Sequence, residues 1–212
     1  MGRHLVPLTV DNLADLPDRC RSCVFWERAP DGADAVRRTG RAELVKREWT
    51  VTVLREWGSC GRLAYVDGRP VGFLLYAPPS AVPRSLSFPT GPVTADAVQL
   101  MTAWIALDHR GQGIGRVLVQ SMAKDLLLRG VRAVEAFGDA RPRAASASEP
   151  YGDCLAPARY LEAVGFEEVR PHPHVPRLRL ELRRTVSWRV DMEQAWDRLF
   201  HSGRPRGVLH PA

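Results

Sequence analysis

The chain has 212 residues, 45% of them hydrophobic and 25% charged, which is ordinary for a globular protein and excludes wholesale disorder. Its length predicts one domain with an additional element and a core that needs no disulfides. No apolar run approaches the roughly 20 residues of a membrane span, and the first residues lack the apolar stretch of a signal peptide, so we expect a cytoplasmic protein with no membrane partner.

The net charge is +6, from 30 basic and 24 acidic residues, and the only lysines are Lys46 and Lys124. A basic surface can attract polyanions such as nucleic acid. The arginines are scattered here and acidic residues lie between them, whereas a nucleic-acid surface needs a basic stripe or patch. We therefore expect no nucleic-acid partner and attribute the arginine content to coding bias.

The first half of the chain predicts strands, helices and a hairpin. Apolar residues recur at three- and four-residue steps along the longer helix, which Gly58 ends. Asp67-Gly68 between two apolar runs is a strong hairpin signal. The expected elements are a strand at His4–Val10, a short helix ending near Leu16, an irregular segment at Pro17–Asp34, a helix at Arg41–Trp57 and strands at Leu63–Val66 and Val71–Tyr76.

The second half opens with a proline-rich loop at Pro78–Pro92 and continues as alternating strands and helices. We expect residues 1–188 to form one domain, 189–200 an appended helix and 201–212 a disordered tail. The apolar side of the appended helix either packs on the core or mediates a homodimer. The expected elements are strands at Val98–Ile105, Val131–Phe137, Phe166–Arg170 and Arg177–Arg184, helices at Gly113–Arg129, Pro157–Val164 and Asp191–Phe200, and a polar loop at Arg141–Asp153.

Four cysteines are present, at positions 20, 23, 60 and 154. Cys20 and Cys23 form a C-x-x-C pair, but a structural zinc site needs two further ligands and no second close pair exists. We therefore predict no metal site and interpret the cysteines as buried or loop thiols. A thiol or metal sensor built on Cys20 and Cys23 is the weaker alternative.

The most informative segment lies between a buried strand and a helix, where residues 107 to 115 read LDHRGQGIG. Glycines allow unusual backbone angles and close approach of a ligand, and the first amides of a helix have no internal partner. With the helix dipole they predict an anion site for a phosphate or pyrophosphate, with Arg110 and Arg116 at its rim. The spacing fits neither the dinucleotide fingerprint nor a Walker loop.

Arg110-x-x-Gly113-x-Gly115, after a buried strand and at the start of an amphipathic helix, resembles the acetyl-CoA motif of the GNAT superfamily of N-acetyltransferases. The segment Ala158–Phe166, ARYLEAVGF, resembles the second cofactor motif of that family, and the order of elements fits over roughly residues 3–185. The resemblance implies a single α/β domain. Its central sheet is mixed but mostly antiparallel, with about seven strands, a splayed fourth and fifth strand, and flanking helices.

The resemblance also implies a cofactor position. The amides of residues 112–115 would hold the pyrophosphate of coenzyme A, and the end of the preceding strand would pair with the pantetheine arm like an added strand. The acetyl group would pass directly from acetyl-CoA to an amine, either of a small molecule or of a peptide. The implied cofactor-binding residues are Trp104, Ile105, Arg110, Gly111, Gln112, Gly113, Ile114, Gly115 and Arg116.

The sequence departs from the family pattern at both acid–base positions. Gln99 stands where members with a carboxylate base often have a glutamate, and an amide cannot act as a base. Leu161 stands at the usual position of the acidic tyrosine, and Tyr160 precedes it. Glu135 on the fifth strand is the candidate base and Tyr160 the candidate acid. The structural alternatives are a carboxylate solvated at a strand edge for Glu135 and a tyrosine packed in the core for Tyr160.

Three further residues lie in regions that line the acceptor or thioester site in this family, namely Glu27, Glu43 and Cys154. Surface carboxylates and a small apolar side chain are the alternatives for them. His109 borders the phosphate turn and is interpreted as a loop residue. Because Gln99 and Leu161 replace the usual catalytic groups, an acyl-CoA-binding regulatory module on the same fold is the alternative to an enzyme.

Overall fold

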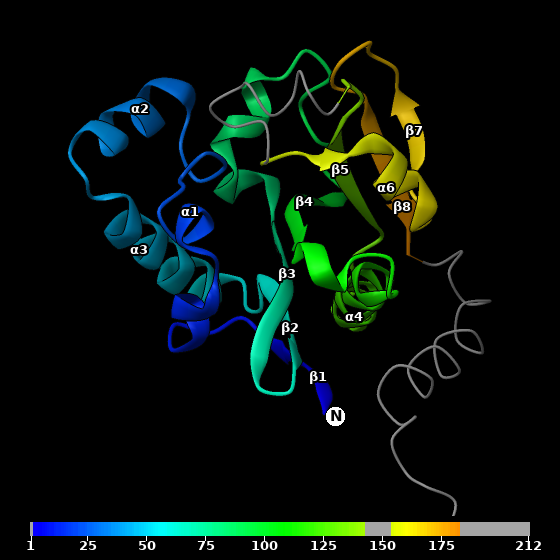
Figure 1. Cartoon of the computed structure of the whole chain (residues 1–212). Coiled ribbons are helices and arrows are strands. Elements are labelled where there is room, and N and C mark those ends of the chain that lie inside the picture. Colours follow the sequence, from blue (N-terminus) through cyan, green and yellow to red (C-terminus); the bar gives the residue numbers. More distant parts are fainter. Residues whose placement is uncertain (1, 143–153, 183–212) are drawn as a thin grey trace, which may run out of the picture.

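The computed structural model describes residues 2–142 and 154–182, and it shows one open sheet with helices on both faces (Figure 1). The strand order is β1-β2-β3-β4-β5-β8-β7, and β6 pairs with the end of β5. Neighbouring strands are antiparallel except β4–β5 and β5–β6, which are parallel. The strands are β1 (Arg3–Pro7), β2 (Gly61–Val66), β3 (Arg69–Ala77), β4 (Ala97–Ile105), β5 (Ala133–Asp139), β6 (Ala156–Pro157), β7 (Glu167–Arg170) and β8 (Arg177–Glu181).

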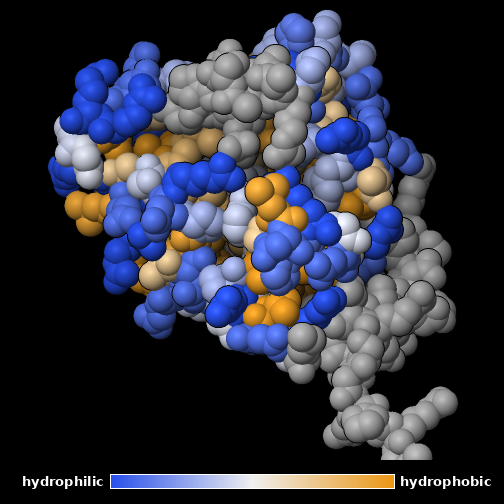
Figure 2. All heavy atoms as spheres, in the orientation of Figure 1, coloured by the Kyte–Doolittle hydropathy of each residue, from blue (hydrophilic) through white to orange (hydrophobic). Residues whose placement is uncertain are grey.

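Two groups of helices cover the two faces of the sheet (Figure 1). One core cluster joins α4 and α6 to one face, and the other joins the N-terminal segment and α3 to the opposite face. On the face that Figure 2 shows, hydrophilic residues predominate and hydrophobic ones reach the surface in small separate patches. The helices are α1 (Asp18–Arg21), α2 (Pro30–Arg38), α3 (Ala42–Glu56), α4 (Ile114–Leu128) and α6 (Ala158–Ala163).

The predicted mixed sheet is confirmed, including the divergence of its fourth and fifth strands. β4 and β5 pair over only four positions, from Ala97 opposite Ala133 to Leu100 opposite Ala136. Met101 is an extra residue against β3, because Tyr76 pairs with Leu100 and Leu75 with Thr102. A bulge bends and twists its strand. The bulge therefore lies where β4 leaves β5. Beyond the bulge, β4 continues to Ile105 without β5 as a partner.

Several element boundaries differ from the sequence-based expectations. The segment at residues 17–34 is not wholly irregular: it contains α1 and the start of α2, which begins at Pro30, a residue suited to the first helical position. The first strand ends at Pro7 instead of continuing to Val10, and the short strand β6 was not expected. The predicted helix at 191–200 and the tail at 201–212 lie outside the described residues.

The buried face of α4 anchors the helix that follows the glycine-rich turn at residues 107–113. Its residues Val117, Leu118, Met122 and Leu126 are almost fully buried against the sheet, whereas Leu128 at the end of the helix is 81% exposed. The packing of this face fixes where the N-terminus of α4 points. Within the described residues, no helix is long and apolar enough to cross a membrane.

Truncation of Leu126 to alanine should lower the free energy of unfolding by about 3 kcal/mol, because it removes a fully buried side chain and leaves a cavity. The matched control is Leu128→Ala on the same helix, which should change stability by less than about 0.5 kcal/mol. Urea unfolding followed by circular dichroism measures both. Equal losses would contradict the placement of α4.

Candidate cofactor and acyl-transfer site

The turn between β4 and α4 exposes the start of a helix. After a single 3-10 turn at Leu107–His109, Gly111 and Gly113 adopt φ values of 73° and 81°, in the left-handed region that favours glycine. Gly113 occupies the position before α4, and no side chain in the described part of the chain caps that helix. The first amides of α4 therefore have no side-chain cap, which is the geometry that an anion site at a helix start requires.

Three arginines surround this turn. The Arg110 Nε donates to the carbonyl oxygen of Ile105 at 3.0 Å, which ties the turn to the end of β4. The Arg116 Nη2 donates to the carbonyl oxygen of Ala163 at 2.7 Å, which ties α4 to α6. Both residues remain exposed, so the remaining guanidinium N–H groups face solvent at the rim of the turn. These contacts fix the two cations that the sequence analysis singled out.

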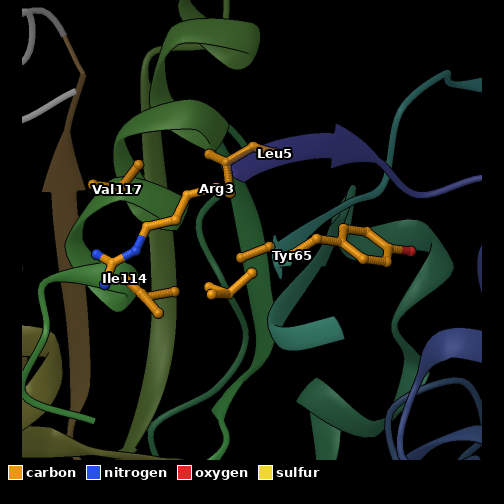
Figure 3. Close-up of a pocket in the computed structure, with 7 residues that line it drawn as sticks. Arg3, Leu5, Tyr65, Ile114 and Val117 are labelled. Atoms are coloured by element: carbon orange, nitrogen blue, oxygen red, sulfur yellow. The ribbon is translucent and has the colours of Figure 1, made fainter. Parts of the chain in front are cut away.

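The third arginine beside the turn is Arg3, which the sequence did not single out. Its Nη2 donates to the Gln112 Oε1 at 3.1 Å, although the two residues are 109 positions apart. Gln112 in turn donates from Nε2 to the carbonyl oxygen of Asp108 at 3.0 Å. Figure 3 shows Arg3 extended over a small hollow beside Ile114 and Val117 of α4. No local pattern could have identified Arg3, because only the pairing of β1 with β2 brings it there.

The second half of β4 offers an open backbone edge. Trp104 and Ile105 pair with Phe73 and Gly72 of β3 on one side. On the other side, β4 has no strand partner beyond Leu100 among the described residues. Exposed strand edges accept an extended ligand through main-chain hydrogen bonds. The edge leads from the divergence of β4 and β5 to the glycine-rich turn before α4, so one elongated ligand could contact both.

Tyr160 lies against the first turn of α4. Its hydroxyl donates to the carbonyl oxygen of Gly115 at 3.1 Å, and a Cβ atom at position 115 would come within 2.9 Å of its ring. Burial raises the pKa of the Tyr160 phenol, so the group stays protonated in neutral solution. The neighbouring Leu161 is fully buried in the core between α6 and the sheet. The structure thus places Tyr160 beside the predicted phosphate site.

Glu135 is fully buried and its carboxylate is engaged on both oxygens. Oε1 accepts from the Thr94 hydroxyl at 2.7 Å and from the Arg179 Nη1 at 2.9 Å. Oε2 accepts from the Thr94 amide at 3.1 Å and lies 3.4 Å from the Arg177 Nε. These contacts tie β5 to β8 and to the loop before β4. Such pairing is what a buried carboxylate requires, whether or not it also takes part in catalysis.

Gln99 lies opposite Glu135 in the parallel register of β4 and β5. It is fully buried, and within the described residues neither its side-chain nitrogen nor its oxygen has a hydrogen-bond partner. A buried amide without a partner is costly and usually marks a bound water or ligand group. Gln99 therefore supplies a neutral donor and acceptor next to the point where the strands separate.

The other predicted acceptor-side carboxylates are both paired. Glu27 is 2% exposed and forms an ion pair with the buried Lys46. Glu43 is exposed and pairs with Arg21, with 2.6 Å between Nε and Oε1. His109 contacts the Asp108 carboxylate at 3.1 Å, as expected of a loop residue. In the parts of the chain described here, no three His, Cys, Asp or Glu side chains are grouped to hold a metal ion.

An aromatic cluster flanks the divergence of the strands on the face covered by α1–α3. Phe137, the first residue of β5 beyond its pairing with β4, stacks on Phe88 at 4.6 Å and on Trp26 at 6.2 Å between ring centroids. Phe25 meets Trp26 edge to face at 5.0 Å. These rings come from the N-terminal segment, the proline-rich loop and β5. They form an aromatic wall within the core cluster of this face, next to the point where β4 and β5 separate.

Solved structures with the same architecture include acetyltransferases. The chain is similar to the PaiA N-acetyltransferase from Thermoplasma acidophilum in complex with coenzyme A, at a TM-score of 0.56 and 11% identity over 85% of this chain and 99% of that one. It is also similar to an N-acetyltransferase from Staphylococcus aureus Mu50, at a TM-score of 0.53 and 14% identity over 86% of this chain and 99% of that one. A third similar structure is the putative acetyltransferase YncA from Salmonella typhimurium, solved with acetyl-CoA. Its TM-score is 0.53 and its identity 12%, over 86% of this chain and 95% of that one.

At these identities the structural matches show the fold alone. No curated protein sequence matches the chain significantly. The sequence model of the family described as the acetyltransferase (GNAT) family matches residues 19–147, which is more than half of the chain. The matched segment includes the whole glycine-rich turn between β4 and α4. The chain therefore belongs to the GNAT family of acetyltransferases.

Proposed function

We propose that this protein is an acetyl-CoA-dependent N-acetyltransferase that transfers an acetyl group directly to a primary amine. The observation that carries the proposal is the continuous path from the separation of β4 and β5, along the open edge at Trp104 and Ile105, to the exposed start of α4. Its length suits an elongated ligand with an anion at one end. Family membership supports the acyl-transfer chemistry, and coenzyme A in the Thermoplasma acidophilum structure supports the ligand.

In this proposal each part of the path has its own task. The amides of residues 112–115 bind the pyrophosphate, and Arg3, Arg110 and Arg116 add positive charge around it. The free edge of β4 at Trp104 and Ile105 pairs with the pantetheine arm. Acetyl-CoA supplies an acetyl group activated as a thioester. A backbone amide of the same edge is suited to stabilise negative charge that develops on its carbonyl oxygen.

The acceptor amine must reach this carbon in its neutral form, because only the neutral form has a lone pair to attack with. Gln99 can orient the amine through its unpartnered amide but cannot take its proton. Both oxygens of Glu135 already accept hydrogen bonds. The roles of Glu135 as base and Tyr160 as acid therefore stay predictions.

Because position 99 carries an amide and not a carboxylate, a cofactor-binding regulatory module is the alternative to an enzyme. Calorimetry with acetyl-CoA, followed by a thiol-release assay over a panel of primary amines, separates the two. Binding together with amine-dependent thiol release supports the enzyme and defines the acceptor class. Binding without release on any amine favours the regulatory module, and no binding contradicts both.

Substitution of Gly113 by aspartate should weaken binding of coenzyme A at least about 100-fold, because it places a carboxylate at the start of α4, where the proposed pyrophosphate would bind. The matched control is Gly130→Asp, at the other end of α4. Gly130 has a φ of 76° and open space around it, so the control adds the same charge and a similar backbone strain. Unchanged affinity in folded Gly113→Asp would refute the assignment of the turn.

Removal of the Tyr160 hydroxyl in Tyr160→Phe should raise the Kd for acetyl-CoA about three- to tenfold, because it deletes one hydrogen bond to the first turn of α4. Since the hydroxyl lies at the phosphate end of the path, we expect kcat to fall by less than about threefold. Calorimetry and steady-state kinetics measure the two constants. A fall in kcat of about 100-fold with an unchanged Kd would instead support a general acid.

Neutralisation of the buried carboxylate in Glu135→Gln should lower the free energy of unfolding by about 3–5 kcal/mol, because it leaves Arg177 and Arg179 without their buried partner. The control is Glu181→Gln, which removes a partly exposed carboxylate from the same Arg179 and should cost less than about 1 kcal/mol. Urea unfolding gives both values. Equal stabilities with a large loss of turnover would favour a catalytic role for Glu135.

A further inference from the structure

Two cysteines that are distant in the sequence lie in contact beside the aromatic wall. The Sγ atoms of Cys23 and Cys154 are 3.6 Å apart, although 131 positions separate the residues. The Trp26 indole N–H donates to the carbonyl oxygen of Cys154 at 3.1 Å and so holds the two segments together. Both thiols are partly exposed. The structure thus gives Cys23 a thiol partner, Cys154, that lies far from it in the sequence and outside the C-x-x-C pair.

The surroundings make the two thiols unequal. The Cys154 thiol donates a hydrogen bond that lowers the pKa of Cys23 to about 7, against the effect of burial, which raises it. The positive charge of Lys46 lowers this pKa further, and the carboxylate of Glu27 raises it. The same hydrogen bond and burial raise the pKa of Cys154. Cys60 is fully buried, and burial raises its pKa to about 12. Cys23 is therefore the nucleophilic thiolate and Cys154 its protonated neighbour.

We propose that Cys23 and Cys154 form a redox-active dithiol site that reacts with small-molecule disulfides and closes into a Cys23–Cys154 disulfide. The Cys23 thiolate attacks one sulfur of the disulfide, which forms a mixed disulfide and releases one thiolate. The Cys154 thiol then loses its proton to solvent and attacks the Cys23 sulfur, which releases the second thiolate. Two protein thiols are oxidised, and one disulfide is reduced to two thiols.

Closure of this bond would join the N-terminal segment that carries Trp26 to the chain just before β6. Trp26 already packs on Phe137, where β5 leaves β4. The disulfide would therefore fix the aromatic wall next to the point where β4 and β5 separate. Because the bond closes a loop of more than a hundred residues, it should also raise the melting temperature by several degrees.

The test uses the full chain, reduced and then titrated with oxidised glutathione. We expect intact mass to fall by the two hydrogens of one disulfide, peptide mapping to find Cys23 joined to Cys154, and dithiothreitol to reverse the change. Cys20→Ser is the matched control and should behave like the parent protein. A Cys20–Cys23 bond, a glutathione adduct that persists on Cys23, or no reaction at all would overturn the proposal.

Two substitutions at position 154 separate the two roles of Cys154, as hydrogen-bond donor to Cys23 and as partner in the disulfide. In Cys154→Ser the hydroxyl can still donate to Cys23 but cannot form the bond, so glutathione should remain on Cys23 and the pH midpoint of its alkylation should stay near 7. In Cys154→Ala the donor is lost, so the midpoint should rise toward the value of about 8.5 of a free thiol. Equal midpoints in the two variants would contradict the pairing. Neither readout depends on acetyl transfer, so it remains informative if the proposed function fails.

Discussion

The short parallel pairing of β4 with β5 is the constraint on which the rest of the site depends. Four paired positions join the two halves of the sheet, and beyond Leu100 the strands separate. Main-chain donors and acceptors in a protein interior need partners, so a strand that leaves its neighbour must either face solvent or receive something in its place. The bulge at Met101 directs β4 away from β5, and the glycine turn then directs α4 back across the sheet. The open edge of β4 thus follows from one interruption in one ladder, and the glycine turn lies at its end.

Local features of this design could be predicted from the sequence. The glycine turn, the amphipathic α4 and the hairpin of β2 and β3 each depend on residues close together in the chain, and each was expected. Contacts between distant residues could not be predicted. The approach of Arg3 to Gln112 and of Cys23 to Cys154 arises only when the sheet is assembled, since no spacing in the sequence encodes either.

The buried charges illustrate the same limit. Glu27 and Glu135 both stood out in the sequence as carboxylates near the expected cleft, and both prove to be bound by cations, Lys46 in one case and Arg177 with Arg179 in the other. A carboxylate without solvent requires such partners whatever its function, so a charge in a central strand signals pairing as readily as catalysis. Gln99 stood out in the sequence only because it replaces the glutamate of the family pattern. Only the structure shows that both polar atoms of its buried side chain lack hydrogen-bond partners among the described residues.

The contact between Gly115 and Tyr160 has an evolutionary consequence. A methyl group at position 115 would come within 2.9 Å of the tyrosine ring, so the present packing of Tyr160 against the first turn of α4 requires a glycine there. Alanine at position 115 would force the ring of Tyr160 to shift, and a smaller residue at position 160 would leave a gap that a larger residue at 115 could fill. The two helices of the cofactor region are therefore expected to vary in concert, with substitutions at 115 and 160 appearing as linked pairs among descendants of this sequence.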